Sequence, residues 1–175
     1  MIIHEKFIIA TPTKCGTLSI EHALEQQGCK LFWPRHDPEP PAGFTGEVIM
    51  MRRNPIARFE SMWNYYKRQP FWKRNDRYTD LNDWCYHFFN LAGLDHWTMT
   101  LSMFEQRSQA TRTFDMTEIP QLFEYLRVYG INVEKIPYRN KTLHPDPFQL
   151  TDEYRALRDE WARPDMERFE YAWPG

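Results

Sequence analysis

The sequence predicts an α/β protein in which a parallel sheet is flanked by helices. Short apolar runs, such as 7–10 and 47–51, have the length and composition of buried strands. A segment with helical spacing of its apolar residues follows each of these runs, and Gly, Pro or Asn marks the joints between them. Because strands that alternate with helices are typical of a parallel sheet, we expect one such domain over residues 1–175.

The expected elements follow from breakers and capping residues along the chain. Pro34 to Gly46 is too rich in proline for regular structure. Asn54 is a favoured N-cap and Pro55 fits a first helical turn, so a helix is expected there. In order, strands are expected at 7–10, 30–33, 47–51 and 111–114, and helices from residue 17 and at 54–67, 80–92, 94–106, 119–129, 151–161 and 164–172.

Composition limits the classes of function. With 175 residues, 42% of them hydrophobic, the chain is long enough to bury a core. Its net charge of −2 provides no basic field for nucleic acid, and no apolar run of about 18 residues predicts a membrane span. Cys15, Cys29 and Cys85 are odd in number and irregularly spaced, which favours free thiols in a reducing compartment. Since the first residues do not resemble a signal peptide, a cytoplasmic protein is expected.

The segment FIIATPTKCGTLSIEHAL, residues 7–24, carries the first functional motif. Its strand meets a loop, Thr11–Gly16, that opens directly into a helix. The N–H groups at the start of a helix and the positive end of its dipole favour an anion there. Lys14 adds a full charge and Thr17 a hydroxyl, so the loop is predicted to hold a phosphate-like group.

The order of residues in the loop disfavours two familiar kinds of phosphate site. A Walker loop requires G-x-x-x-x-G-K-[ST], but Lys14 precedes Gly16 and no glycine lies upstream of it. A thiol phosphatase loop needs an arginine six residues after its cysteine, where Glu21 stands here. Cys15 is therefore interpreted as a small spacer rather than a nucleophile.

The loop resembles the 5′-phosphosulfate loop of sulfotransferases that use 3′-phosphoadenosine-5′-phosphosulfate (PAPS). In that family the loop reads approximately Pro-Lys-Ser/Cys-Gly-Thr-Thr, and the chain reads PTKCGTL at 12–18. One threonine is inserted between the proline and the lysine, and a leucine replaces the second threonine. The resemblance implies a P-loop-like three-layer fold with PAPS as donor. It also implies that the 5′-phosphosulfate is bound by Thr13, Lys14, Cys15, Gly16, Thr17 and Leu18.

A second motif follows the strand at 47–51. The segment RNPIARFES, residues 53–61, resembles the 3′-phosphate motif of the same family, Arg-x-Pro-x-x-Arg-x-x-Ser. Arg53 and Ser61 have its eight-residue spacing, and a guanidinium fork with a hydroxyl suits a terminal phosphate. The resemblance implies that this pair binds the 3′-phosphate and that adenosine 3′,5′-bisphosphate is the product. Arg52 or Arg58 is a better candidate than Arg53 for a structural role.

The resemblance continues more weakly toward the C-terminus. The segment YRNKT, residues 138–142, is similar to an Arg-Asn-x-Thr/Ser loop that closes over the nucleotide. This likeness implies contacts from Arg139 and Lys141. Residues 165–171 are similar to the closing segment of the family's terminal helices. The likeness thus extends over nearly the whole chain, at low density outside the first two motifs.

His36 is the candidate general base. It follows the expected second strand, where sulfotransferases commonly place a His or Glu base, and imidazole titrates near neutral pH. Asp37 and Glu39 are neighbouring carboxylates that could orient His36 or replace it. In this scheme His36 removes the proton of the acceptor hydroxyl, Lys14 stabilises charge on the leaving oxygen, and no metal is required.

Two other functions stay open. A nucleotide or phosphate kinase on a related fold would need a Ser or Thr directly after the loop lysine, where Cys15 stands. A non-catalytic nucleotide-binding module would bind the bisphosphate without turnover. For a transferase the acceptor carries a hydroxyl: a carbohydrate or small molecule is expected, with phenols and peptide tyrosine also open. The sequence does not indicate the oligomeric state.

Overall fold

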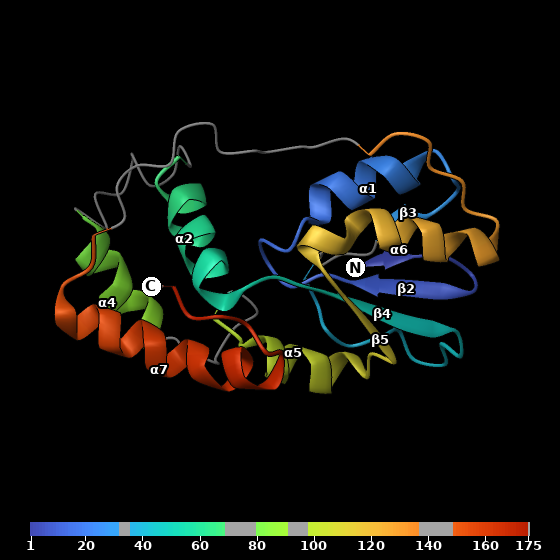
Figure 1. The fold of residues 1–175 in the computed structure, drawn as a ribbon. Coiled ribbons are helices and arrows are strands. Elements are labelled where there is room, and N and C mark those ends of the chain that lie inside the picture. The colour runs from blue at the N-terminus through green and yellow to red at the C-terminus, as the bar shows by residue number, and fades with distance from the viewer. Residues whose placement is uncertain (32–35, 69–79, 91–97, 137–148, 175) are drawn as a thin grey trace. The chain divides into compact units, whose positions relative to one another are not determined.

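The computed structural model describes residues 1–31, 36–68, 80–90, 98–136 and 149–174 (Figure 1). It confirms the α/β class, because within these residues a five-stranded sheet is flanked by helices. The sheet is mixed, however, and not purely parallel as expected. The strands are β1 (Ile2–Ile3), β2 (Phe7–Ala10), β3 (Lys30–Leu31), β4 (Glu47–Arg52) and β5 (Arg112–Asp115).

The antiparallel part of the sheet was not predicted. The strand order is β3-β1-β2-β4-β5, in which β2, β4 and β5 are parallel while β1 is antiparallel to both β2 and β3. β1 has only two residues, too few for a sequence pattern. It reverses into β2 through a tight turn in which His4 N donates to Phe7 O over 2.9 Å. The strand expected at 30–33 is present as β3, and residues 32 and 33 lie outside the described part.

The helices lie where they were expected, with two corrections. α5 begins at residue 101 rather than 94, since residues 98–100 are not helical. The helices expected at 151–161 and 164–172 are one continuous helix. The helices are α1 (Thr17–Glu25), α2 (Pro55–Tyr66), α4 (Leu81–Asn90), α5 (Leu101–Ser108), α6 (Ile119–Leu126) and α7 (Asp152–Arg168), with 3₁₀ turns at Met116–Glu118 and Arg127–Tyr129.

The chain divides into two compact units, which we describe separately. Unit 1 comprises Met1–Arg53 and Met103–Lys141 and contains the sheet with α1 and α6. Unit 2 comprises Asn54–Ser102 and Thr142–Gly175 and contains α2, α4 and α7. The boundary falls within α5. The single domain over residues 1–175 stays a prediction.

In unit 1 the central strands are apolar and fully buried. All four residues of β2 have no exposed surface, and neither do Ile49, Met50 and Met51 of β4. α1 and α6 lie next to each other (Figure 1), and their first turns are in close proximity. A Cβ on Gly16, before α1, would lie 3.4 Å from Ile119 Cδ1 at the start of α6. This packing places the beginnings of both helices at one end of the sheet.

Gly46 sets the beginning of β4 against the segment before β2. A Cβ at this position would lie 2.4 Å from Lys6 O, so only a glycine fits without displacing backbone. The close approach allows Glu47 N to donate to Lys6 O over 3.0 Å. From this bond the register continues with Phe7 paired to Glu47.

Glu47 then ties β4 to β5 and to the end of α6. Its carboxylate accepts hydrogen bonds from Tyr125 Oη at 2.7 Å, Tyr129 Oη at 2.5 Å and Arg112 Nε at 3.2 Å. Burial opposes ionisation of Glu47, but these three bonds outweigh it and hold the pKa of the carboxyl below its ordinary 4.5. The hydrogen bond to Glu47 also raises the pKa of the Tyr129 phenol. The amino edge of the sheet is therefore closed by a polar network.

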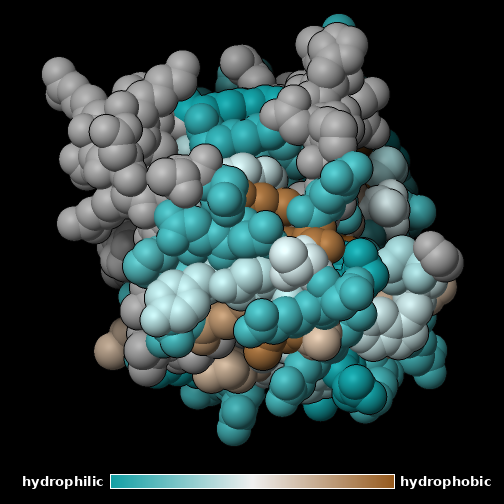
Figure 2. All heavy atoms as spheres, turned by 90° about the vertical axis from the view of Figure 1, so that its left-hand side faces the viewer, coloured by the Kyte–Doolittle hydropathy of each residue, from teal (hydrophilic) through white to brown (hydrophobic). Residues whose placement is uncertain are grey.

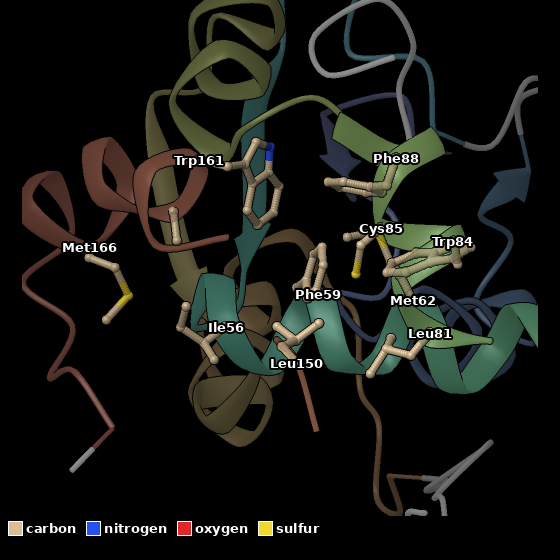
Figure 3. Close-up of a cluster of buried hydrophobic side chains, with 11 residues drawn as sticks. Ile56, Phe59, Met62, Leu81, Trp84, Cys85, Phe88, Leu150, Trp161 and Met166 are labelled. Atoms are coloured by element: carbon tan, nitrogen blue, oxygen red, sulfur yellow. The ribbon is translucent and has the colours of Figure 1, made fainter. Parts of the chain in front are cut away.

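The core of unit 2 is aromatic (Figure 3). Phe59 of α2 is fully buried, and its ring centroid lies 5.1 Å from those of Trp84 and Phe88 in α4 and 5.9 Å from that of Trp161 in α7. Figure 2 shows the face that carries α4 and α7, which is mostly hydrophilic where it is described, with apolar side chains in small patches. These aromatic residues thus form a core rather than an exposed stacking surface.

Asp165 of α7 fixes where α5 begins. It is fully buried, and its carboxylate accepts from Leu101 N at 2.5 Å, Ser102 N at 2.8 Å and Ser102 Oγ at 2.5 Å. The first N–H groups of a helix have no acceptor within the helix. Asp165 supplies that acceptor from a distant part of the sequence, which explains why the start at residue 101 was not predicted.

The same contact accounts for the continuity of α7 through Pro164. A proline inside a helix removes one backbone hydrogen bond and crowds the preceding turn. Here tertiary bonds hold the helix on both sides of the proline: Trp161 Nε1 donates to Thr98 O over 2.9 Å, and Asp165 accepts from α5. Tertiary contacts therefore override the local preference for a break.

We predict that Asp165→Ala lowers the free energy of unfolding by roughly 2–5 kcal/mol, because each N–H group left without an acceptor costs about 1–3 kcal/mol. Urea unfolding followed by tryptophan fluorescence measures the change. Asp165→Asn keeps one acceptor oxygen and should lose less. Asp152→Ala is the control on the same helix, since Asp152 pairs with Arg155 on the surface and such pairs contribute about 0–1 kcal/mol. Equal losses from Asp165→Ala and Asp152→Ala would contradict the capping role.

Candidate functional site

The three parallel strands end at one edge of the sheet in unit 1. β2 ends at Ala10, β4 at Arg52 and β5 at Asp115, and the register pairs Arg52 with Asp115. In open α/β sheets, ligands bind just beyond the carboxyl ends of such strands. The predicted phosphate-binding loop therefore lies at the edge where a ligand is expected.

The loop from Thr11 to Gly16 forms a tight turn at this edge. Cys15 N donates to Pro12 O over 3.2 Å, which closes the turn. Lys14 and Gly16 both have left-handed backbone conformations, with φ of 65° and 83°. Glycine adopts this conformation readily, whereas for lysine it costs about 1–2 kcal/mol. Such strain persists only where the surroundings fix the backbone, and it is common at ligand-binding sites.

The start of α1 suits an anion. Gly16 is the N-cap and offers no side chain to the first turn. Thr17 is only 7% exposed, and its Oγ1 has no hydrogen-bond partner among the described residues; the same holds for the fully buried Thr11 Oγ1. Because buried hydroxyls are normally satisfied, an anion at this helix start is a natural partner for Thr17. Leu18 lies in the first turn of α1, and because its side chain is apolar, only its backbone N–H can contact an anion.

Arg53 reaches this loop from β4. It follows the strand directly, and its Nη1 donates to Lys14 O over 3.2 Å. Both residues are half-buried. The structure thus brings the guanidinium of Arg53 to the backbone of Lys14, two basic residues that were assigned from separate motifs, 39 positions apart.

His36 lies at the beginning of the same loop. Its Nδ1 is 2.8 Å from Thr11 O. A carbonyl oxygen can only accept, so Nδ1 carries the proton and the lone pair of the neutral ring is on Nε2. The hydrogen bond therefore selects the tautomer in which Nε2 is the basic nitrogen.

The two carboxylates considered as alternatives have other contacts. Asp37 Oδ1 accepts from Glu39 N at 3.1 Å and so shapes the local turn. Glu39 is exposed, with Oε1 3.9 Å from Arg107 Nε. His36 is therefore the best placed of the three candidates for a base beside the loop.

Ser61 and Arg58 belong to α2, in unit 2. Ser61 is half-buried about two turns into the helix, and its pairing with Arg53 stays a prediction. Arg58 is fully buried, and its Nη1 donates to Met99 O over 2.8 Å. This contact agrees with the structural role that the sequence analysis favoured for Arg58.

Two features of this edge were not identified from the sequence. One is Thr11, whose carbonyl anchors His36; no sequence signal distinguishes it from other loop residues. The other is a capping box before α6. Asp115 Oδ1 accepts a hydrogen bond from Thr117 N at 2.9 Å, and Glu118 Oε2 accepts one from Asp115 N at 2.6 Å. The Asp-x-x-Glu spacing of the capping box could have revealed it.

No protein-family model, curated protein or solved structure matches this chain. In the part of the chain that the structure describes, no helix is long and apolar enough to cross a membrane. The described residues also include no group of three or more His, Cys, Asp or Glu placed to hold a metal ion. Arg139 and Lys141 lie outside the described residues, so their predicted contacts stay predictions.

Proposed function

We propose that this protein is a sulfotransferase that moves a sulfuryl group from PAPS to an acceptor hydroxyl. The observation that carries the proposal is the left-handed loop at Lys14, which precedes a helix and holds the Arg53 guanidinium on its own carbonyl. Two cations and a helix start at one loop suit a ligand with several anionic groups. The likeness of both motifs to the sulfotransferase family, in the same order, favours PAPS as that ligand.

The proposed roles divide into binding and reaction. Residues 13–18 hold the 5′-phosphosulfate, Arg53 with Ser61 holds the 3′-phosphate, and Arg139 and Lys141 close over the nucleotide. His36 Nε2 takes the proton of the acceptor hydroxyl while the acceptor oxygen bonds to sulfur. Lys14 stabilises negative charge on the bridging oxygen as its bond to sulfur breaks. The products are a sulfate ester and adenosine 3′,5′-bisphosphate, and the scheme needs no metal.

The acceptor is proposed to be a carbohydrate or another small hydroxyl compound, and the protein to be cytoplasmic. Neither nucleic acid nor a membrane is a proposed partner, given the net charge of −2. Cys15, Cys29 and Cys85 are free thiols, which is compatible with a reducing compartment. Burial raises the pKa of Cys29 to about 11, so this thiol stays protonated at neutral pH.

The first test of this function is nucleotide selectivity. Adenosine 3′,5′-bisphosphate at 100 times its Kd should raise the free energy of unfolding by about 2.7 kcal/mol. AMP at the same concentration should raise it much less, because Arg53 and Ser61 are assigned to the 3′-phosphate. Calorimetry with the bisphosphate, AMP and ATP compares the affinities. Equal binding of AMP and the bisphosphate would remove the reason for naming PAPS, and a preference for ATP would favour a kinase.

Lys14→Ala should keep the fold and lower turnover by about 10²–10³-fold, the usual effect of removing one preorganised donor to a transition state. The affinity for the bisphosphate should fall less, since the charge that Lys14 stabilises grows only during transfer. Steady-state kinetics and calorimetry on the same preparation separate the two effects. Lys6→Ala, at an exposed lysine of unit 1, is the control. Normal turnover in folded Lys14→Ala protein would rule out this role.

His36→Ala should lower transfer by about 10²–10⁴-fold, the usual contribution of general acid–base catalysis. The acidic limb of the rate–pH profile should disappear with the imidazole, while bisphosphate binding stays nearly unchanged. His36→Asn is the matched variant, because its amide N–H can still donate to Thr11 O although it cannot act as a base. If His36→Asn retains turnover and the acidic limb, the base is Asp37 or Glu39 instead.

A further inference from the structure

The hydrogen bond from Arg53 Nη1 to Lys14 O joins the two predicted phosphate sites directly. One partner belongs to the motif assigned to the 3′-phosphate, and the other to the loop assigned to the 5′-phosphosulfate. The bond length of 3.2 Å is that of an ordinary N–H···O contact, with a charged donor. Arg53, which is proposed to bind the 3′-phosphate of PAPS, therefore also contacts the loop that is proposed to bind the 5′-phosphosulfate.

Lys14 is the residue of the loop whose backbone most needs support. Its φ of 65° is left-handed, a conformation that a lysine keeps only where neighbouring groups hold it. Within the loop, the bond from Cys15 N to Pro12 O closes the turn around it. The bond from Arg53 fixes the carbonyl of Lys14 itself and hence the orientation of the peptide that follows it. That orientation in turn determines where the Lys14 side chain leaves the backbone.

Arg53 is well anchored for this task. It follows β4, whose pairing extends to Met50 with β2 and to Arg52 with β5. A guanidinium carries five N–H donors in a rigid planar fork, so it can hold a carbonyl oxygen and an anion at the same time. An anion drawn to Arg53 would therefore act on the group that supports Lys14.

We propose that Arg53 is a positioning residue that couples occupancy of the 3′-phosphate site to the conformation of the loop at Lys14. The 3′-phosphate immobilises the Arg53 fork, and the fork holds the loop in the geometry used for transfer. The nucleotide part of this inference rests on the proposed function, whereas the support of the loop by Arg53 does not. It follows that the 3′-phosphate contributes to kcat and not only to affinity.

The experiment is amide hydrogen exchange of the segment 11–17, measured without nucleotide and with adenosine 3′,5′-bisphosphate or AMP at saturation. Arg53→Ala should speed exchange at Cys15 about tenfold or more without nucleotide, the effect of losing a charge-assisted hydrogen bond. In the wild type, the bisphosphate should protect the segment more than AMP does, and this difference should vanish in Arg53→Ala. Arg127→Ala is the control, since Arg127 forms an exposed pair with Glu124 on the surface of unit 1.

Arg53→Lys keeps the charge and one donor group, so it tests the proposal even if the alanine variant does not fold. Its exchange without nucleotide should stay within about threefold of the wild type, and it should keep the preference for the bisphosphate. With saturating PAPS, Arg53→Ala should lower kcat about tenfold and Arg53→Lys should recover much of that loss, a split that a merely structural role would not produce.

The outcomes separate this inference from the proposed function. Unchanged exchange in folded Arg53→Ala protein, with the bisphosphate still preferred by the wild type, overturns the coupling and leaves the sulfotransferase proposal intact. Faster exchange in Arg53→Ala, with neither nucleotide bound by the wild type, confirms that Arg53 supports the loop and overturns the proposed function. Equal protection by AMP and the bisphosphate overturns the role of the 3′-phosphate.

Discussion

The parallel pairing of β2 with β4 is the constraint on which the candidate site depends. Because the two strands run in the same direction, the loop after β2 and the arginine after β4 emerge at one edge of the sheet. The pairing also explains how residues 39 positions apart form a hydrogen bond, from Arg53 to Lys14. Neither residue would have this neighbour if β4 lay antiparallel to β2, since Arg53 would then emerge at the opposite edge.

The two edges of this sheet serve different purposes. At the amino edge Glu47 accepts three hydrogen bonds, from β5 and from the end of α6, so the polar side chains at that edge satisfy one another. At the carboxyl edge the chain instead holds a left-handed lysine and buried threonine hydroxyls that find no partner among the described residues. A left-handed lysine and two buried threonine hydroxyls thus lie together where a ligand is proposed, while the opposite edge stabilises the strands. This separation is expected when binding groups cannot also be optimised for stability.

The sequence predicted the elements that depend on local patterns. Apolar runs marked β2 and β4, and Asn54 with Pro55 marked the start of α2, where the Asn54 side chain accepts from two backbone N–H groups. Elements that depend on distant partners were not predictable. β1 is too short for a pattern, α5 starts where Asp165 caps it, and α7 continues through its proline because tertiary bonds hold it. In the site, the motifs identified the loop, but only the structure showed that Thr11 sets the tautomer of His36.

Gly46 determines which parts of the chain tolerate a change of length. The residue admits no side chain, because its backbone lies against Lys6 O at the point where β4 begins. Insertions upstream, in the part of the proline-rich loop between Glu39 and Gly46, would change only how the chain arrives at this point. One added residue between Gly46 and Arg53 would shift β4 by one position and reverse the faces of its side chains, since successive residues of a strand alternate. Arg53 would then emerge on the wrong side of the sheet. The spacing of seven positions from Gly46 to Arg53 is therefore required for the geometry of the site.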